Sequence, residues 1–381
     1  MILIMDPNER IDELWEQAEL TTKRSEKVRL LNELIQITDQ HQLTVLGIGA
    51  RIDLLAAARD RRSLVALAWI FSALDRDLNL YDEISEEGLE LLYYWYYIII
   101  VDVAVNYPEI SKEKIWALLD DYLQRIKADG YQHEVLEHKI RMFLLTDLGE
   151  LKKAKEAYYA WEKALSEQKK EERIDETYEW DLYTRARSQF EILDDIDQAL
   201  EVGTLILDGH VTDGVVENSL PSLLIMPLWE KGYLNKAEEF YQRTRNYLIH
   251  ESIYHDLSWQ LGYLALTDQL EDAHHLFTEH VVKGFDPWEG PQDNPAARFD
   301  FYLHVRLFFH RLQAEGKKSI LFQPPQAFPL QPKIKNEFDV DEIVHWLNQT
   351  LVDLATRFDQ RNENRLYHED LEKYANWIWQ T

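Results

Sequence analysis

The sequence contains no cysteine among its 381 residues. Disulfide bonds, thiolate nucleophiles and cysteine-ligated zinc or iron–sulfur sites are therefore excluded. Basic residues are also scarce, with 41 Lys and Arg against 69 Asp and Glu and a net charge of −28. Because a negative field of this size repels phosphate backbones and anionic lipid, we expect no nucleic acid and no membrane as a partner. A protein or peptide segment fits better.

Long apolar runs are missing as well. The most apolar stretch, Leu91–Val101, is about half as long as the roughly twenty residues that a membrane-spanning helix needs. The N-terminal MILIM lacks the basic segment that precedes the apolar core of a signal peptide, so we expect a cytoplasmic protein. A helix that is apolar on all sides packs against several neighbours. We therefore expect Trp95 and most of Tyr93–Ile100 to be buried, with one or two tyrosine hydroxyls reaching a groove.

Signatures of catalysis and cofactor binding are absent too. The sequence contains no GxxxxGK[ST], GxGxxG, GxSxG or HExxH segment. His255, His274, His275 and His280 lie near one another in the sequence, but only Glu271 and His275 have the spacing of two ligands on one helix face. Paired acids are too frequent in so acidic a chain to indicate acid–base catalysis. We predict that the protein is not an enzyme and has no catalytic residues, metal site or cofactor.

What the sequence does contain is helical periodicity. Nearly every ordered stretch has apolar residues at i, i+3 and i+4, whereas alternation typical of strands is nearly absent. Short breaks separate these stretches, as at Asp129-Gly130 and Lys231-Gly232. Helices of roughly 13–20 residues joined by tight turns predict an all-α fold, an α-solenoid of stacked antiparallel helical hairpins.

The hairpins repeat around a small residue near the start of each second helix. An alanine follows an aliphatic residue by three positions, and in three of the four repeats an aromatic residue follows four positions later. We expect the aliphatic side chain to pack back across the hairpin, the alanine to allow close helix approach, and the aromatic ring to fill the gap to the next hairpin. The aligned residues are Leu151-Ala154-Tyr158, Ile196-Ala199-Gly203, Leu234-Ala237-Tyr241 and Leu270-Ala273-Phe277.

These repeats resemble the tetratricopeptide repeat superfamily, whose period is about 34 residues. The resemblance is good over 131–283 and weaker over 44–129, and the chain also resembles bacterial proteins of this kind without an assigned activity. It implies a right-handed superhelix of helical hairpins with helical caps. The predicted regions are an N-terminal cap over 1–43, repeats over 44–283 and a C-terminal helical region over 284–381.

One long stretch, Lys317–Glu337, has no helical pattern and contains four prolines and more lysines than acids. Long loops in compact domains tend to be functional or disordered. We predict that this proline-rich arm lies along its own groove or that of a neighbouring subunit, or packs as a linker on the last helices. Beyond it, Val340–Phe358 and Arg365–Trp379 have amphipathic periodicity and are expected to cap the stack.

First helices line the inner groove of such a superhelix, and the repeat frame identifies the residues that face inward. The mixture of charges, hydroxyls and aromatic rings at these positions suits peptide recognition. The predicted partner-binding residues are Tyr93, Tyr97, Lys139, Phe143, Asp181, Arg185, Ser222, Met226, Trp229 and His255. Because Trp and Arg dominate interface hot spots, we expect Lys139, Arg185 and Trp229 to be the energetic centre.

The sequence therefore favours a non-catalytic scaffold that binds a protein or peptide segment in its groove. The alternative is a peptide-responsive bacterial regulator, in which N-terminal helices act on another protein once the groove is occupied. Residues 8–40 are predicted to form two helices without the Gly-containing turn of a helix-turn-helix, so direct DNA binding is not expected. A homodimer is left open.

Overall fold

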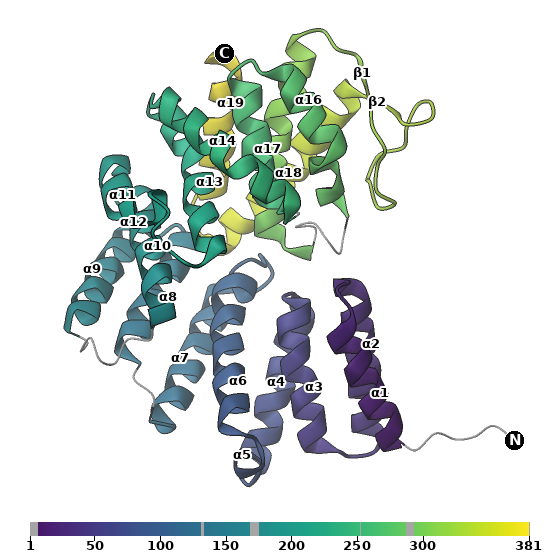
Figure 1. The fold of residues 1–381 in the computed structure, drawn as a ribbon, viewed down its shortest axis with the longest axis vertical. Coiled ribbons are helices and arrows are strands. Elements are labelled where there is room, and N and C mark those ends of the chain that lie inside the picture. Colours follow the sequence, from purple (N-terminus) through teal and green to yellow (C-terminus); the bar gives the residue numbers. More distant parts are fainter. Residues whose placement is uncertain (1–6, 131–132, 168–174, 252, 287–292, 381) are drawn as a thin grey trace, which may run out of the picture. The chain divides into compact units, whose positions relative to one another are not determined.

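Helices account for nearly all the secondary structure in the part of the chain that the structure, a computed structural model, describes (Figure 1). The described residues are 7–130, 133–167, 175–251, 253–286 and 293–380. The all-α prediction is confirmed. The chain folds as two compact units, Met1–His133 and Glu134–Thr381. None of the described helices is both long enough and apolar enough to cross a bilayer. The division into three regions stays a prediction.

The N-terminal unit consists of helices that pack on their neighbours in chain order. They are α1 (Pro7–Leu20), α2 (Arg24–Gln40), α3 (Thr44–Ala58), α4 (Arg61–Arg76), α5 (Leu80–Glu83), α6 (Glu86–Ile98), the π-helix η1 (Ile99–Ala104) and α7 (Lys112–Ala128). A tight turn at Arg59 and Asp60 separates α3 from α4. Arg59 has a left-handed φ of 45° and ends α3, and the Asp60 carboxylate then caps α4 by accepting a bond from the backbone N–H of Arg62.

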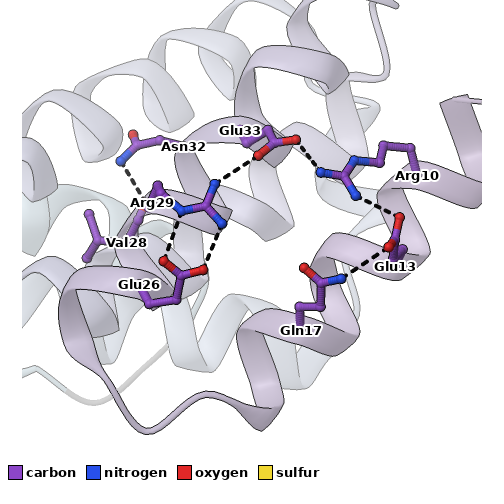
Figure 2. Close-up of polar contacts among 8 residues, drawn as sticks. All are labelled: Arg10, Glu13, Gln17, Glu26, Val28, Arg29, Asn32 and Glu33. Atoms are coloured by element: carbon purple, nitrogen blue, oxygen red, sulfur yellow. Dashed lines mark hydrogen bonds and ion pairs between the residues drawn. The ribbon is translucent and has the colours of Figure 1, made fainter.

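Ion pairs join α1 to α2 at the surface. Figure 2 shows Glu33 of α2 between two arginines, accepting from Arg10 Nη2 at 2.5 Å and from Arg29 Nη1 at 3.2 Å. Arg10 also donates to Glu13, and Arg29 to Glu26, each at 2.7 Å. These side chains are at least about a third exposed, so water and salt screen the pairs. The apolar contacts between the two helices therefore carry most of their stability.

The aromatic helix α6 is buried much as predicted. Trp95, Tyr93 and Tyr96 are buried, whereas Tyr94 is 52% exposed. The helix runs directly into η1, whose wider turn is rare and accommodates an extra residue in the helix. The prediction is confirmed for most of the run, and Tyr94 is the exception.

Two tyrosine hydroxyls of α6 bind carboxylates of α7 and of its C-cap residue. Tyr93 donates to the Asp129 carboxylate, and Tyr96 donates to Asp121 at 2.9 Å. Burial and the neighbouring carboxylates raise the pKa of both phenols far above the ordinary value, so both stay protonated donors. Carboxylates of α7 and of its C-cap residue Asp129 thus satisfy these two hydroxyls, and the expectation that one or two hydroxyls of the run reach a groove stays a prediction.

The C-terminal unit contains the repeats and the chain end. Its elements are α8 (Glu134–Asp147), α9 (Leu151–Glu167), α10 (Asp175–Glu191), α11 (Ile196–Val202), α12 (Thr204–Leu207), α13 (Gly214–Glu230), α14 (Leu234–His250), α15 (Tyr254–Leu266), α16 (Leu270–Glu279), the 3-10 helix η3 (Val281–Phe285), α17 (Pro295–Ala314), β1 (Ser319–Leu321), β2 (Glu337–Asp339), α18 (Val340–Asn362) and α19 (Leu366–Gln380). Within hairpins, α8 packs on α9, α13 on α14, and α15 on α16. First helices also contact one another in sequence order, α10 with α13, α13 with α15, and α15 with α17.

The repeat residues pack largely as the alignment predicts. The four aligned alanines, at positions 154, 199, 237 and 273, are each 0% exposed, and the three aligned aromatic rings are buried. Gly203 replaces the aromatic residue in one repeat because space is missing there. A Cβ at this position would lie 2.7 Å from Leu220 Cδ2. The prediction that a small residue near the start of each second helix allows close helix approach is therefore confirmed.

The prediction that the aliphatic residue packs back across its hairpin is wrong in two of the four repeats. Leu151 is 43% exposed and Leu234 is 55% exposed, so neither packs back across its hairpin as expected. Ile196, by contrast, is buried. Position in the helix does not explain the difference, because Leu151, Leu234 and Ile196 are each the first residue of their helix.

The proline-rich arm contains a short hairpin that the sequence did not indicate. Strand β1 pairs antiparallel with β2, with Ser319 opposite Asp339. Two phenylalanines anchor the arm to its own unit: the Phe322 ring lies 5.2 Å from Phe277, and the Phe328 ring lies 5.0 Å from Phe285. The arm therefore packs on α16 and η3 of its own chain.

Candidate functional site

The ten predicted partner-binding residues are divided between the two units. Tyr93 and Tyr97 belong to the N-terminal unit, and the other eight belong to the C-terminal unit. Tyr93, Ser222 and Met226 are buried, so they cannot be contacted in the folded chain. For Ser222 and Met226 the reason is that α13 is covered by helices on several sides, namely α10, α14 and α15.

The two predicted central cations pair with carboxylates of their own unit. Lys139 Nζ lies 3.0 Å from Asp181 Oδ1, and Arg185 Nε lies 2.6 Å from Glu162 Oε1. Both cations lie about 6 Å from the centre of the buried Trp161 ring. The structure thus brings Lys139, Asp181 and Arg185 together, but an anionic partner would have to replace an existing ion pair.

Phe143 is half-buried beside these ion pairs, on the first helix of its hairpin. The guanidinium carbon of Arg187 lies 5.9 Å from the centre of its ring. Phe143 therefore contributes to packing between α8 and α10.

His255 on α15 is held between two acids. Its Nε2 lies 2.9 Å from Asp300 Oδ2, and its Nδ1 lies 3.4 Å from Asp256 Oδ1. Burial favours the neutral ring, but the hydrogen bonds to Asp256 and Asp300 outweigh burial and raise the pKa of His255 to about 10. His255 is therefore a cation at neutral pH and not a free base.

Asp300 on α17, which sequence reasoning missed, organises this region. Its Oδ2 also accepts a hydrogen bond from Trp259 Nε1 at 2.5 Å. Although burial opposes its charge, the hydrogen bonds from cationic His255 and from Trp259 hold the pKa of the Asp300 carboxyl below its usual range. One ionised carboxylate thus ties α15 to α17.

His304, one turn after Asp300, links α17 to α19. Its Nδ1 lies 2.9 Å from the Asp300 carbonyl oxygen, and its Nε2 lies 2.9 Å from the Tyr374 hydroxyl. Burial lowers the pKa of His304, so the ring is neutral, with Nδ1–H donating and Nε2 accepting from Tyr374. Both ring nitrogens have partners.

Helix α19 covers the face on which these side chains lie. The Tyr367 ring packs 4.9 Å from Phe299 of α17, and the Trp377 ring packs 5.3 Å from Trp229 of α13. Between these contacts, Arg306 Nη2 of α17 donates to the Leu371 carbonyl oxygen at 3.2 Å. In Figure 1 α19, in yellow, lies beside α13 and α17, in agreement with these contacts.

An ion pair completes this docking. Lys373 Nζ lies 2.7 Å from Glu230 Oε2 at the end of α13, and Lys373 also lies 5.0 Å from the Trp377 ring centre. We call the surface that receives α19 the docking face. It consists of Trp229 and Glu230 of α13 with Phe299, His304 and Arg306 of α17.

The anchors of α19 have the spacing of a helix laid in a groove. Tyr367, Leu371, Tyr374 and Trp377 stand at i, i+4, i+7 and i+10, which places them on one helix face. This spacing was visible in the sequence as amphipathic periodicity. What it could not show was that the face lies against α13 and α17 rather than only at the end of the stack.

Comparison of the chain with protein-family models, curated proteins and solved structures finds no match. The resemblance to tetratricopeptide repeats therefore stays a prediction that rests on the aligned residues. In the part of the chain that the structure describes, no three His, Asp or Glu side chains are grouped so that they could hold a metal ion.

Proposed function

We propose that this protein is a non-catalytic scaffold that binds an amphipathic helix of a protein partner on the docking face. The main observation in support is that the face already holds such a helix, α19, through anchors at i, i+4, i+7 and i+10. Helix-in-groove recognition uses this anchor pattern. Of the residues predicted from sequence, Trp229 belongs to the docking face, and His255 supports it through Asp300.

The order of helix contacts supports a tetratricopeptide-like solenoid as the framework of this scaffold. First helices touch the next first helix, and α14 also touches α15, the first helix of the following hairpin. Buried alanines at the same place in four hairpins are what close stacking of hairpins requires. Each hairpin would then add one first helix to a continuous binding face.

The chemistry of the polar residues favours binding over catalysis. The nitrogens of His255 and His304 are engaged by carboxylates, a carbonyl group and a phenol. A general base needs a free lone pair within reach of a substrate proton. These groups position helices instead.

A second candidate is the peptide-responsive regulator. The observation that favours it is the separation of α1–α7 into a compact unit of its own. In this proposal the N-terminal unit acts on another protein, and occupancy of the docking face controls it.

The proposed function is tested with a fluorescent peptide that has the sequence of residues 364–380. It is titrated into the full chain carrying Tyr374→Ala and Trp377→Ala, which frees the docking face of its own helix. We expect saturable binding by fluorescence anisotropy. Adding Trp229→Ala, which removes the ring that the Trp377 anchor contacts, should weaken binding at least about tenfold, as loss of a hot spot does. No binding to the double variant, with circular dichroism unchanged, contradicts the proposal.

A further inference from the structure

We infer that α19 is an exchangeable occupant of the docking face, which a partner helix with the same four anchors must displace. This inference rests on the proposed function and specifies its partner and its regulation. The partner helix carries an aromatic residue, a leucine, a tyrosine and a tryptophan at i, i+4, i+7 and i+10.

The depth of burial distinguishes α19 from the core helix that precedes it. Leu347, Leu351 and Phe358 of α18 are each 0% exposed, whereas the most buried described side chains of α19, Leu371 and Trp377, remain 8% and 7% exposed. The opposite face of α19 is exposed at Glu369, Glu372 and Asn376. A helix that buries one shallow face opens at a lower free energy than the core.

The docking of α19 also leaves polar groups poorly satisfied. The Nε–H of Arg306 is buried and has no hydrogen-bond partner among the described residues. Arg306 donates only to a carbonyl oxygen of α19, Leu371 O, and burial lowers its pKa to about 10. An unpaired buried donor costs free energy, so the seated helix is not the best ligand this face can accept.

The two ends of α19 are held differently. At its start, the backbone N–H groups of Tyr367 and His368 donate to the buried Asp359 carboxylate at 2.9 and 3.1 Å. Asn364 Nδ2 donates to the Leu148 carbonyl oxygen at 2.7 Å. The later half is held by the Tyr374 hydroxyl and the Trp377 ring. Asn364, which lies just before α19 and is bound to Leu148, therefore acts as the hinge, and α19 detaches beyond it, beginning with the half that contains Tyr374 and Trp377.

Charge at the far end of the face selects the partner further. Glu230 binds Lys373, which stands six residues after Tyr367 and four before Trp377. A Lys or Arg at the same position of a competing helix would form the same ion pair with Glu230, which is about a third exposed. A competing helix also needs a hydroxyl donor for His304 Nε2, which favours tyrosine over phenylalanine at i+7.

The absence of cysteine allows a direct test of displacement in the full chain. Glu369→Cys places a single fluorophore on the exposed side of α19, and Val352→Cys places the same fluorophore on the exposed side of α18. Unlabelled peptide of residues 364–380 is then titrated up to about millimolar concentration, since a tethered helix competes at an effective concentration of about that size.

We expect the anisotropy of the α19 probe to fall saturably while that of the α18 probe stays constant. A peptide with Tyr374→Ala and Trp377→Ala should need at least about a tenfold higher concentration to produce the same fall in anisotropy. In parallel, labelled wild-type peptide should bind the wild-type chain at least about tenfold more weakly than it binds the chain with Tyr374→Ala and Trp377→Ala. A matched chain with Glu369→Ala and Glu372→Ala should bind like wild type.

Two outcomes separate the inference from the function on which it rests. Equal binding to wild type and to the double variant, with no change at the α19 probe, overturns exchange but leaves a binding scaffold. If the 364–380 peptide binds to neither chain, the proposed function itself is contradicted.

Discussion

Helices α6 and α19 are both rich in aromatic residues, yet they serve different purposes in the molecule. In α6 the Tyr96 ring contacts Phe71 of α4 at 5.0 Å and Tyr122 of α7 at 5.2 Å, so neighbours cover it on two sides. In α19 the Tyr367 ring packs between Phe299 of α17 and Phe358 of α18, and the Trp377 ring packs on Trp229 of α13, whereas the face with Glu369, Glu372 and Asn376 is exposed. Aromatic content alone therefore does not show how a helix is packed, whereas the exposure of its opposite face does.

The largest expected effect is the loss of the α6 tryptophan. Trp95→Ala should lower the free energy of unfolding by about 3–5 kcal/mol, because it opens a large cavity between helices that cannot close. Trp377→Ala in α19 should cost only about 1–2 kcal/mol, since α19 can detach while the rest stays folded. Urea unfolding followed by circular dichroism measures both. Equal losses for the two variants would remove the distinction between the helices.

The next effect concerns the hinge of α19. Gly149 has a φ of +73°, and a Cβ there would lie 2.5 Å from Asn364 Nδ2 and 3.2 Å from Leu366 Cδ2. Gly149→Ala should therefore lower the free energy of unfolding by about 1–2 kcal/mol through backbone strain. It should also displace the start of α19 and thereby increase binding of the 364–380 peptide.

Gly130→Ala is the matched control, because its φ is +81° but no atom lies within 4 Å of the added Cβ. It should destabilise the protein through strain alone and leave binding of the 364–380 peptide unchanged. If Gly130→Ala increases peptide binding as much as Gly149→Ala does, the hinge assignment is incorrect.

A smaller effect depends on pH through His255. Its pKa is raised from an ordinary value near 6.5 to about 10 in the folded chain, so its protonation stabilises the fold fully below pH 6.5. This contribution is lost as the pH rises through 10. His255→Gln should therefore flatten the fall in melting temperature between pH 7 and 10. A variant with an unchanged slope would show that His255 is not held by Asp300 and Asp256.

The smallest effect belongs to Asp370 on α19. Burial raises the pKa of its carboxyl to about 7, against the opposing charge of Lys373, with the carboxylates of Asp300, Glu369 and Asp359 nearby adding to the rise. Its protonated form favours the docked state, so this stabilisation is complete below pH 4 and lost as the pH rises through 7.

Asp370→Asn should accordingly raise the melting temperature at pH 8 by one or a few degrees while changing it little near pH 4. It should also weaken peptide binding at pH 8, because the chain's own helix is then seated more firmly. Glu369→Gln, on the exposed side, should do neither.

The parts of the fold that depend on local chemistry could be read from the sequence. The sequence predicted turns at Gly130 and Gly232, and both glycines have positive φ angles in the structure. The alanines that the repeat alignment identified are buried. Contacts between distant segments could not be read in the same way. His255 was predicted, but its partner Asp300 lies 45 residues further on, in a different helix.

The errors have the same origin. Met226 and Ser222 were expected on an open surface, but α13 is covered by neighbouring helices, which periodicity in one helix does not reveal. Leu234 was expected to be buried but is exposed. The repeat alignment could not show this, because it does not show where the neighbouring helix ends. Trp229 was expected in a partner-binding groove, which stays a prediction, and the sequence did not indicate its contact with Trp377 of the same chain.

Amide hydrogen exchange of the unmodified full chain tests the central claim most directly. Amides of residues 372–378 in α19 should exchange at least about a hundredfold faster than those of 347–358 in α18, because α19 opens without global unfolding. Excess 364–380 peptide should accelerate exchange in α19 further while slowing exchange in α13 and α17. Equal protection of α18 and α19, unaffected by peptide, would contradict the account and make α19 a permanent part of the core.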